Sequence, residues 1–446
     1  MKTIRLIILL PAVLLMMKAS AQPAAENVLT LHECLIKAID HSPRLKISAL
    51  EQTKLDYARR ETVGQGLPAV SLSGSYDDFV NLPVQMIPGE FFGHPGELIP
   101  VQFGTTYNLS GSLDFSQIIY NQTYLSALRV TKLLIEQNTL TDENAKNGLV
   151  FEVAQSYYYA QIASNQIRNL QSNLQKLEKA EQIARSQFDN GMIMKVDVDR
   201  IKVNRLNVQT QIDRLTVNYE QQLNFQRYLM GLDLDTPIAF PDSVTTTTLS
   251  LLEKANPDNH IDIRMLEKQK QIAFANMKVN QSEYFPYLAL IGSFSYSNQS
   301  NDFSIYGDPG KWYNTSLIGL RLHFPVFSGL RTKYKVSQSK IVFDQLNLTE
   351  EDTRQMLKVQ AKDATGRLLN AISDEQRQRE NMTLAEKVYT ISQEQYQKGV
   401  ISLTDLLNAE SGLRDAQTNH SLALAQMKIA ELEYMKANGT LLEILK

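Results

Sequence analysis

Residues that could support catalysis are sparse in this sequence and form no recognised catalytic pattern. His32-Glu33 begins like the paired-histidine motif of zinc proteases, but no second histidine follows at helical spacing, so a capping or surface role is the better interpretation. The remaining histidines are scattered and have no cysteine partners at metal-binding spacing; they are His41, His94, His260, His323 and His420. We therefore expect no catalytic residue, no cofactor and no metal.

Nucleotide-binding patterns are also missing. Gly64 and Gly66 begin a Gly-x-Gly pattern, but Ala69 occupies the third glycine position and a strand is expected to follow instead of a helix. No P-loop pattern occurs, so any transport that involves this chain is not driven by its own nucleotide hydrolysis. The sequence predicts that the protein is not an enzyme.

One motif of glycine, aromatic and acidic residues occurs twice, in FDNGMIMKVDV (188–198) and YQKGVISLTDLLNAE (396–410). Gly191 and Gly399 suit the residue just beyond a helix, where a positive φ is needed and a side chain would be strained. Asp197 and Asp405 then fall early in the next helix, where the macrodipole favours an acid. The motif predicts the same helix-to-helix reversal at two places in the chain.

The segments before these reversals are predicted to be unusually long helices. Residues 121–190 and 329–398 contain no proline, and each would reach about 105 Å as one continuous helix. Rows of residues seven apart favour coiled-coil packing. These rows are Ala163, Leu170, Leu177 and Ala184, and then Ala409, Ala416, Ala423, Ala430 and Ala437. The triplet Tyr157 to Tyr159 is better explained by packing than by a ligand site.

Four short stretches alternate between apolar and polar residues and predict strands with one apolar face: 69–76, 107–115, 287–296 and 317–324. A soluble sheet would alternate in the same way, but the lengths and the aromatic residues near the strand ends fit an outer-membrane barrel. Residues 81–102 and 298–311 are expected to be the longer loops of its extracellular side. Because about eight strands is the practical minimum for such a barrel, several chains must share one.

The first residues are typical of an export signal. Lys2 and Arg5 precede an apolar run at 6–17, and Ala19-Ser20-Ala21 offers a cleavage site, so the mature chain is expected to begin at Gln22. Removing Lys2, Arg5 and Lys18 reduces the 45 basic residues to 42 against 48 acidic ones, which argues against nucleic-acid binding. The single cysteine, Cys34, excludes an internal disulfide and lies too far from the apolar run for lipid attachment.

Taken together, these features resemble the TolC-like outer membrane efflux protein family, the outer membrane factors of tripartite efflux systems. The two reversal motifs are the most specific pieces, followed by residues 410–441, which are similar to the family's closing helix. Residues 320–340 and, more weakly, 113–130 resemble its strand-to-helix junctions. The resemblance covers essentially the whole mature chain.

The resemblance implies an α+β membrane protein with an internal two-fold repeat. Three chains would form one 12-stranded outer-membrane β-barrel, with four strands from each, continued by a long α-helical periplasmic barrel. The chain is expected to begin with a signal peptide (1–21) and a first repeat (22–230), which has a helix, strands at about 68–80 and 103–117, a long helix at 121–190 and a return helix at 192–230. An equatorial segment (231–262) and a second repeat (263–437) follow, and the second repeat has a helix, strands at about 286–297 and 312–324, a long helix at 329–398 and a return helix at 400–437. The last residues are expected to form a C-terminal equatorial tail (438–446).

The implied function is an outer-membrane exit duct of a tripartite efflux system, in a Gram-negative bacterium, that passively conducts small molecules such as drugs and toxic compounds. The implied partners are two further copies of the chain, a periplasmic adaptor, an inner-membrane transporter and outer-membrane lipid. The reversals would form the periplasmic tip, with Gly191, Met192, Gly399 and Val400 in adaptor-docking turns. Two alternatives stay open, namely a type I protein secretion duct of the same family and a non-conducting periplasmic coiled-coil scaffold.

The resemblance also implies a gate at this tip, formed by Asp197, Tyr396, Ile401, Asp405 and Asn408. Two of these residues depart from the family pattern, because Ile401 stands in place of an arginine and Asn408 in place of a second acid. A tyrosine hydrogen bond or an apolar constriction at Ile401 would then replace an ionic latch. The acids, repeated by symmetry, would still attract cations.

Overall fold

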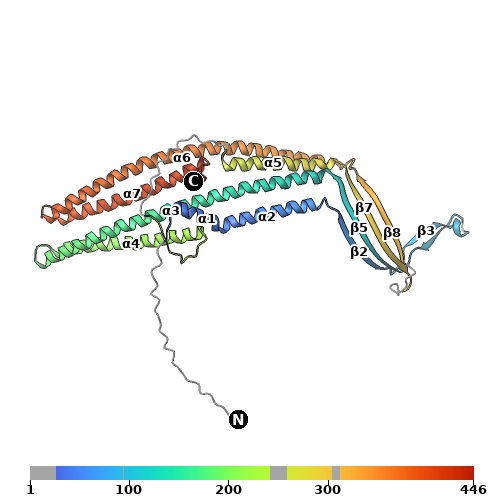
Figure 1. The fold of residues 1–446 in the computed structure, drawn as a ribbon, viewed down its shortest axis with the longest axis horizontal. Coiled ribbons are helices and arrows are strands. Elements are labelled where there is room, and N and C mark those ends of the chain that lie inside the picture. Colours follow the sequence, from blue (N-terminus) through green and yellow to red (C-terminus); the bar gives the residue numbers. More distant parts are fainter. Residues whose placement is uncertain (1–26, 94, 242–258, 304–311, 446) are drawn as a thin grey trace, which may run out of the picture.

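The computed structural model describes residues 27–93, 95–241, 259–303 and 312–445. The chain is elongated, with long helices at one end, a curved sheet and a hairpin at the other end (Figure 1). Outside the described residues lie the expected signal peptide (1–21), His94, most of the expected equatorial segment (242–258) and part of the second expected loop (304–311). In the described part of the chain, no helix combines the length and the apolar character needed to cross a membrane.

Two helical hairpins make up the long end of the molecule. The first joins α3 (Gln122–Asp189) to α4 (Lys195–Leu229), and the second joins α6 (Arg331–Gln397) to α7 (Leu403–Ala437). α3 and α6 are 68 and 67 residues long, as expected for segments without proline. The heptad positions Leu170, Leu177 and Ala184 on α3 and Ala416, Ala423 and Ala430 on α7 are buried.

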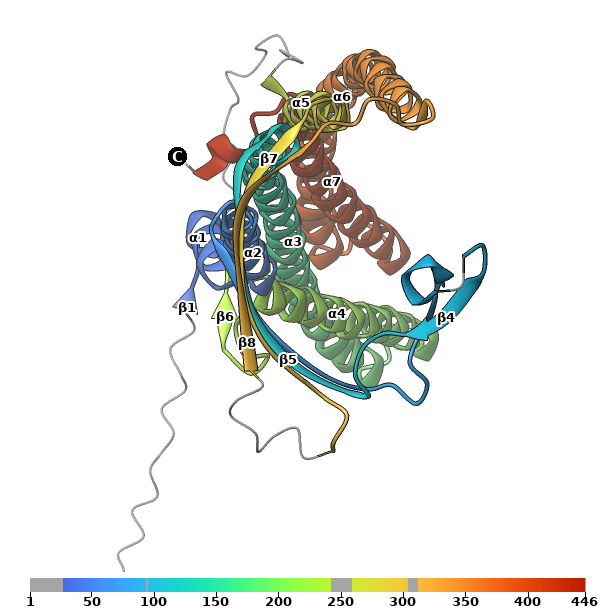
Figure 2. The ribbon, with the colours of Figure 1, turned by 90° about the vertical axis from the view of Figure 1, so that its right-hand side faces the viewer.

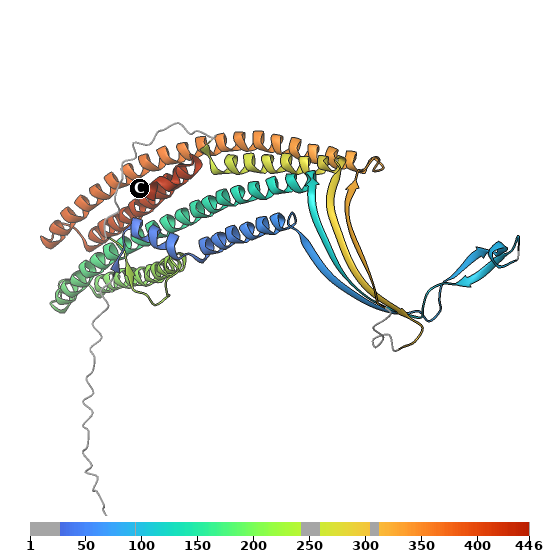
Figure 3. The ribbon, with the colours of Figure 1, turned by 45° about the vertical axis from the view of Figure 1, so that its right-hand side comes forward.

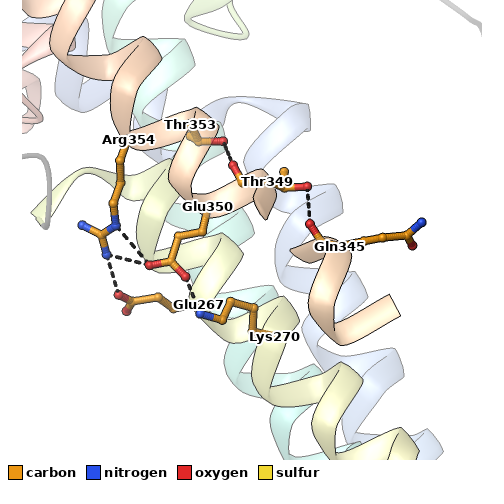
Figure 4. A network of polar contacts seen from close by, with 7 residues as sticks. All are labelled: Glu267, Lys270, Gln345, Thr349, Glu350, Thr353 and Arg354. Carbon is orange, nitrogen blue, oxygen red and sulfur yellow. Dashed lines mark hydrogen bonds and ion pairs between the residues drawn. The ribbon is translucent and has the colours of Figure 1, made fainter. Parts of the chain in front are cut away.

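Shorter helices extend each hairpin toward the sheet. α2 (Pro43–Gly64) packs on α3, and α5 (Ile261–Gln281) lies between α3 and α6. Ion pairs hold α5 against α6, because Glu350 accepts from Lys270 and from Arg354, and Arg354 also contacts Glu267 (Figure 4). Threonine hydroxyls on the same stretch of α6 bond to the preceding turn, from Thr353 to Thr349 and from Thr349 to Gln345.

The sheet contains β2 (Ala69–Asp78), β5 (Tyr107–Asn121), β7 (Tyr287–Ser300) and β8 (Trp312–His323), in this order and all antiparallel. Each half of the chain contributes two neighbouring strands, so the order helix, two strands, long helix, return helix occurs twice. The repeat suggested by the sequence is therefore a structural repeat.

Residues 81–102, expected to be a loop, contain a second hairpin. β3 (Val84–Pro88) pairs with β4 (Leu98–Gln102), and the short 3₁₀ helix η1 (Gly89–Phe92) follows β3. Pro88 and Pro100 argue against strands in a sheet interior, but a two-stranded hairpin has only edges, where the missing N–H of proline is tolerated. Figure 3 shows this hairpin beyond the end of the sheet that is far from the helices.

The largest core lies near the middle of the long helices. α1 (Leu31–His41), the middle of α3, the end of α4 and the 3₁₀ helix η5 (Leu441–Leu445) meet there, next to a parallel pair of β1 (Asn27–Val28) and β6 (Ile238–Ala239). Tyr157 is buried in this core at 4.7 Å from the Phe240 ring, so it is a packing residue. Glu33 and Thr30 form a capping box at the start of α1, which confirms the capping role.

Candidate functional site

Both reversals end their long helix in the same way. Gly191 has φ 70° and Gly399 has φ 73°, in the left-handed region that favours glycine. In the first reversal the Gly191 N–H donates to the Phe188 carbonyl at 2.8 Å and the Met192 N–H donates to the Gln187 carbonyl at 2.8 Å. The second reversal repeats both bonds at 2.9 Å. This pair of bonds is the Schellman motif, so the predicted helix-stop role of both glycines is confirmed.

The two acids of the motif lie in the first turns of α4 and α7, as predicted, but they have different partners. Asp405 belongs to a capping box, because its carboxylate accepts from the Ser402 hydroxyl at 2.7 Å and from the Ser402 N–H at 3.2 Å. α4 has Met194 at the equivalent cap position, and Met194 makes no side-chain cap. Asp197 is therefore not used for capping.

Asp197 pairs instead with Arg200, a residue that the sequence reasoning missed. The Arg200 Nη1 lies 3.5 Å from the Asp197 carboxylate and donates to the Thr404 hydroxyl on α7 at 3.2 Å. This arginine thus links the tip of the first hairpin to the tip of the second. The spacing of Asp197 and Arg200 along one helix was the available signal, but Thr404 is 204 residues away.

Tyr396 is half-buried between the two hairpins. Its ring packs against one cluster that contains Ile201 and Leu403 and against another that contains Leu406. Burial, together with the negative charge of Asp197, raises the pKa of Tyr396. The phenol of Tyr396 is therefore neutral at physiological pH.

The other residues predicted for the tip are placed as follows. Ile401 is partly buried and packs against Leu406 and its neighbours within the second hairpin. Asn408 is exposed, and within the described part of the chain its side chain has no hydrogen bond. Met192 and Val400, at the ends of the two turns, are 73% and 68% exposed. The structure thus pairs Asp197 with Arg200, places Tyr396 within electrostatic reach of Asp197, and leaves Asn408 apart.

A buried acid lies next to the tip. Glu410 is 4% exposed, its pKa is raised by burial, and Arg414 at 3.4 Å on the next turn of α7 opposes that rise. The Glu410 Oε1 atom is buried without a hydrogen-bond partner. Close by, the Lys176 ammonium of α3 lies 5.1 Å from the Tyr389 ring centroid on α6. These charges connect α3, α6 and α7 just inside the turns.

The sheet at the other end of the molecule has two contrasting faces. On one face, aromatic rings gather near the end far from the helices, with Tyr76 stacked on Tyr107 at 6.4 Å and Tyr296 stacked on Trp312 at 5.1 Å. From Tyr296 to Leu288 this apolar face extends about 27 Å along β7, which at a strand tilt of about 40° gives a height of about 21 Å, close to the roughly 25 Å of an outer-membrane apolar band. On the other face, hydroxyl groups pair across strands, as in Ser73 with Ser112 at 2.8 Å.

Comparison with known proteins agrees with this geometry. Residues 254–440 match the family model described as Outer membrane efflux protein. Among curated relatives, "Outer membrane protein TolC" of Vibrio cholerae is 24% identical over 351 residues, which cover 75% of this chain and 77% of the relative. "Probable efflux pump outer membrane protein TtgC" of Pseudomonas putida is 20% identical over 396 residues, 87% of this chain and 78% of the relative. These matches support a TolC-like outer membrane efflux protein.

The fold of this TolC-like protein agrees with that of solved family channels. The outer membrane protein VceC from Vibrio cholerae superposes with a TM-score of 0.70 at 16% identity, covering 92% of this chain and 96% of that chain. The predicted fold class is thereby confirmed for the single chain. The protein is an outer-membrane exit duct of an efflux system, with a periplasmic extension, in a Gram-negative bacterium.

Proposed function

We propose that three copies of this chain close into one duct that passively conducts small molecules, such as drugs and toxic compounds, out of the cell. In this proposal an inner-membrane transporter supplies the energy and a periplasmic adaptor connects the transporter to the tip. The observation that carries the proposal is that one chain leaves both lateral edges of its wall uncovered. The number three comes from the family.

The sheet has one uncovered edge on each side. β2 and β8 are the outermost strands of the four, and each pairs with a neighbour on one side only. In lipid, unpaired backbone groups cost several kcal/mol each, which excludes an open sheet. Pairing β8 of one copy with β2 of the next is a head-to-tail contact that closes into a ring.

The helices have matching uncovered edges. Figure 2 shows α6 along one lateral edge and α2 and α4 along the other, with α3, α5 and α7 between them. α2 has no buried residue and exposes Ile47, Leu50 and Tyr57. α6 exposes Leu348 and Met356, among other apolar side chains. In the ring, the copy on each side would cover one of these two edges.

We further propose that the residues at the tip form the gate and the docking turns. Arg200, which pairs with Asp197, and the half-buried ring of Tyr396 hold the first hairpin against the second in the closed state, while Ile401 stabilises the second hairpin by apolar packing. Asp405 fixes the start of α7, and Asn408 faces solvent. The exposed Met192 and Val400 offer apolar contacts to an adaptor, whose binding would shift the population toward the open tip.

Locking the tip tests this function. A reducible bis-methanethiosulfonate cross-link between Arg200→Cys and Thr404→Cys, which bridges the length of the removed arginine side chain, is expected to stop export in cells and to keep single-channel conductance low in planar bilayers, without loss of trimer. Reduction should restore both activities. The native Cys34 does not interfere, because burial raises the pKa of its thiol to about 12. Export that continues through the locked tip would overturn the gate.

Recording in planar bilayers and deletion of the gene separate the alternative functions. A non-conducting scaffold gives no channels in planar bilayers at any state of the tip. A type I secretion duct shows loss of an exported polypeptide after deletion of the gene, with drug sensitivity unchanged. An efflux duct shows increased drug sensitivity, and this is the outcome that we expect.

A further inference from the structure

Asp114 is an isolated charge in the middle of the sheet. It lies on the hydroxyl-bearing face of β5, in register with Ser71 of β2 and Ser293 of β7. The Ser293 hydroxyl donates to one carboxylate oxygen at 2.8 Å and the Ser112 hydroxyl donates to the other at 2.9 Å. Because both oxygens are held by neighbouring hydroxyls, the carboxylate is fixed in place on this face.

No cation neutralises Asp114 among the described residues, since none of their ion pairs includes it. Charged residues are rare in the four strands, which contain only Asp77, Asp78, Asp114 and Arg321. By register, Asp77 lies six residues, about 20 Å, farther from the helices than Asp114. Arg321 lies four residues, about 13 Å, nearer to them. Asp114 is therefore alone at its level.

On the basis of the trimeric barrel proposed above, we propose that Asp114 determines the charge preference of the membrane part of the duct. Three copies form a ring of carboxylates that favours cationic solutes over anionic ones. The hydroxyl face must line the lumen, since the opposite face carries the apolar side chains and the aromatic girdle that suit lipid. The ring is separate from the acids at the periplasmic tip.

The dimensions of a twelve-stranded barrel make such a ring effective. Strands about 4.8 Å apart and tilted by about 40° give a backbone radius of about 12 Å, so the carboxylates lie about 8 Å from the axis. This distance is about one Debye length at physiological ionic strength. Three charges at this distance enrich monovalent cations about threefold and deplete anions by a similar factor. The ring thus supplies a several-fold preference at the axis.

Arg321 carries a positive charge, opposite to that of Asp114, on the same face of the sheet. Its register partner is Ala289, and it lies more than a Debye length from the Asp114 level. A ring of Arg321 near the helices therefore lowers the cation preference of the barrel as a whole. Removing either charge is expected to shift the preference in opposite directions.

The reversal potential of single channels in a KCl gradient tests the proposal. Asp114→Asn keeps the size of the side chain and an oxygen for one serine hydroxyl, and is expected to lower the ratio of K⁺ to Cl⁻ permeability by about fivefold. Asp114→Glu should retain the preference, and Arg321→Gln should raise it. A ratio that is the same in the wild type and Asp114→Asn would overturn the proposal.

A second variant allows a charge to be attached at position 114 after the channel has assembled, in case Asp114→Asn does not form channels. Asp114→Cys is assembled first and then treated with a negatively or a positively charged methanethiosulfonate, to which the buried Cys34 does not respond. The negative reagent should restore the cation preference and the positive reagent should reverse it. Equal effects of the two reagents would contradict the proposal. Channels with unchanged selectivity in the variants refute this inference alone, whereas absence of any channel in the wild type refutes the proposed duct.

Discussion

Replacing Arg200 by alanine is expected to open the tip without unfolding the chain. The substitution removes the contact with Asp197 and the hydrogen bond to Thr404, which is the only bond of Arg200 to the second hairpin among the described residues. The Arg200 and Asp197 side chains are 54% and 21% exposed, so their ion pair contributes well below 1 kcal/mol. The bond to Thr404 adds about 0.5–1.5 kcal/mol.

A loss of about 1 kcal/mol per chain changes the ratio of open to closed tips about fivefold. If three chains open together, the change is about 100-fold. The open probability of single channels in planar bilayers measures this change. The free energy of unfolding of Arg200→Ala, measured by thermal unfolding, should stay within about 1 kcal/mol of the wild-type value, because Arg200 lies on the surface.

The same latch can be weakened without changing Arg200. Met194→Ser supplies α4 with the cap residue that α7 already has in Ser402, and should draw Asp197 into a capping box. This variant is expected to stabilise α4 while increasing the open probability. Arg214→Ala, on the same helix, is the control and should leave gating unchanged. An open probability that stays at the wild-type value in both Arg200→Ala and Met194→Ser would refute the latch.

Three further predictions concern stability and its pH dependence. Gly399→Ala should destabilise the chain by about 1 kcal/mol in thermal unfolding because its φ is positive, whereas Gly366→Ala, inside α6 with open space around it, should be neutral or stabilising. Hydrogen bonds from Lys270 and Arg354 lower the pKa of Glu350, so its stabilising effect is present above the ordinary glutamate pKa and is lost as pH falls through the lowered value. The difference in melting temperature between wild type and Glu350→Gln should therefore shrink in acid, and a difference independent of pH would contradict this. Burial raises the pKa of Glu410, so the contribution of this residue to folding stability is complete below the ordinary glutamate pKa and is lost as pH rises through the raised value. The melting temperature of Glu410→Gln, relative to that of the wild type, should therefore increase from acid to neutral pH. A decrease would refute the raised pKa of Glu410.

The features of the fold that were predictable from the sequence depend on local rules. A positive φ at Gly191 and Gly399 follows from the need to end a helix, and α3 and α6 follow from long stretches without proline. The sheet strands follow from alternation of apolar and polar residues. The hairpin of β3 and β4 was missed because Pro88 and Pro100 count against strands unless the strands are known to be edges.

The contacts of the candidate site were less predictable because they join distant parts of the chain. Arg200 reaches Thr404 only when α4 and α7 have a particular rotation about their axes, and this rotation depends on packing along both hairpins. Sequence spacing placed Asp197 early in its helix but could not identify its partner. The same holds for Asp114, whose hydroxyl donor Ser293 comes from the other half of the chain.

The two halves of the chain have the same fold, but Asp197 and Asp405 have different roles in it. Ser402 binds Asp405 at the start of α7, so this acid stabilises its own helix and is not available to a neighbour. Met194 offers no such bond at the start of α4, so Asp197 can hold Arg200 against the second hairpin. In the proposed gate, Arg200 of the first half takes the part of the arginine that the family pattern places in the second half, because Asp197 is free to position it whereas Asp405 is bound by Ser402. A latch of the same chemistry thus needs no arginine at position 401, where Ile401 can pack into the second hairpin instead.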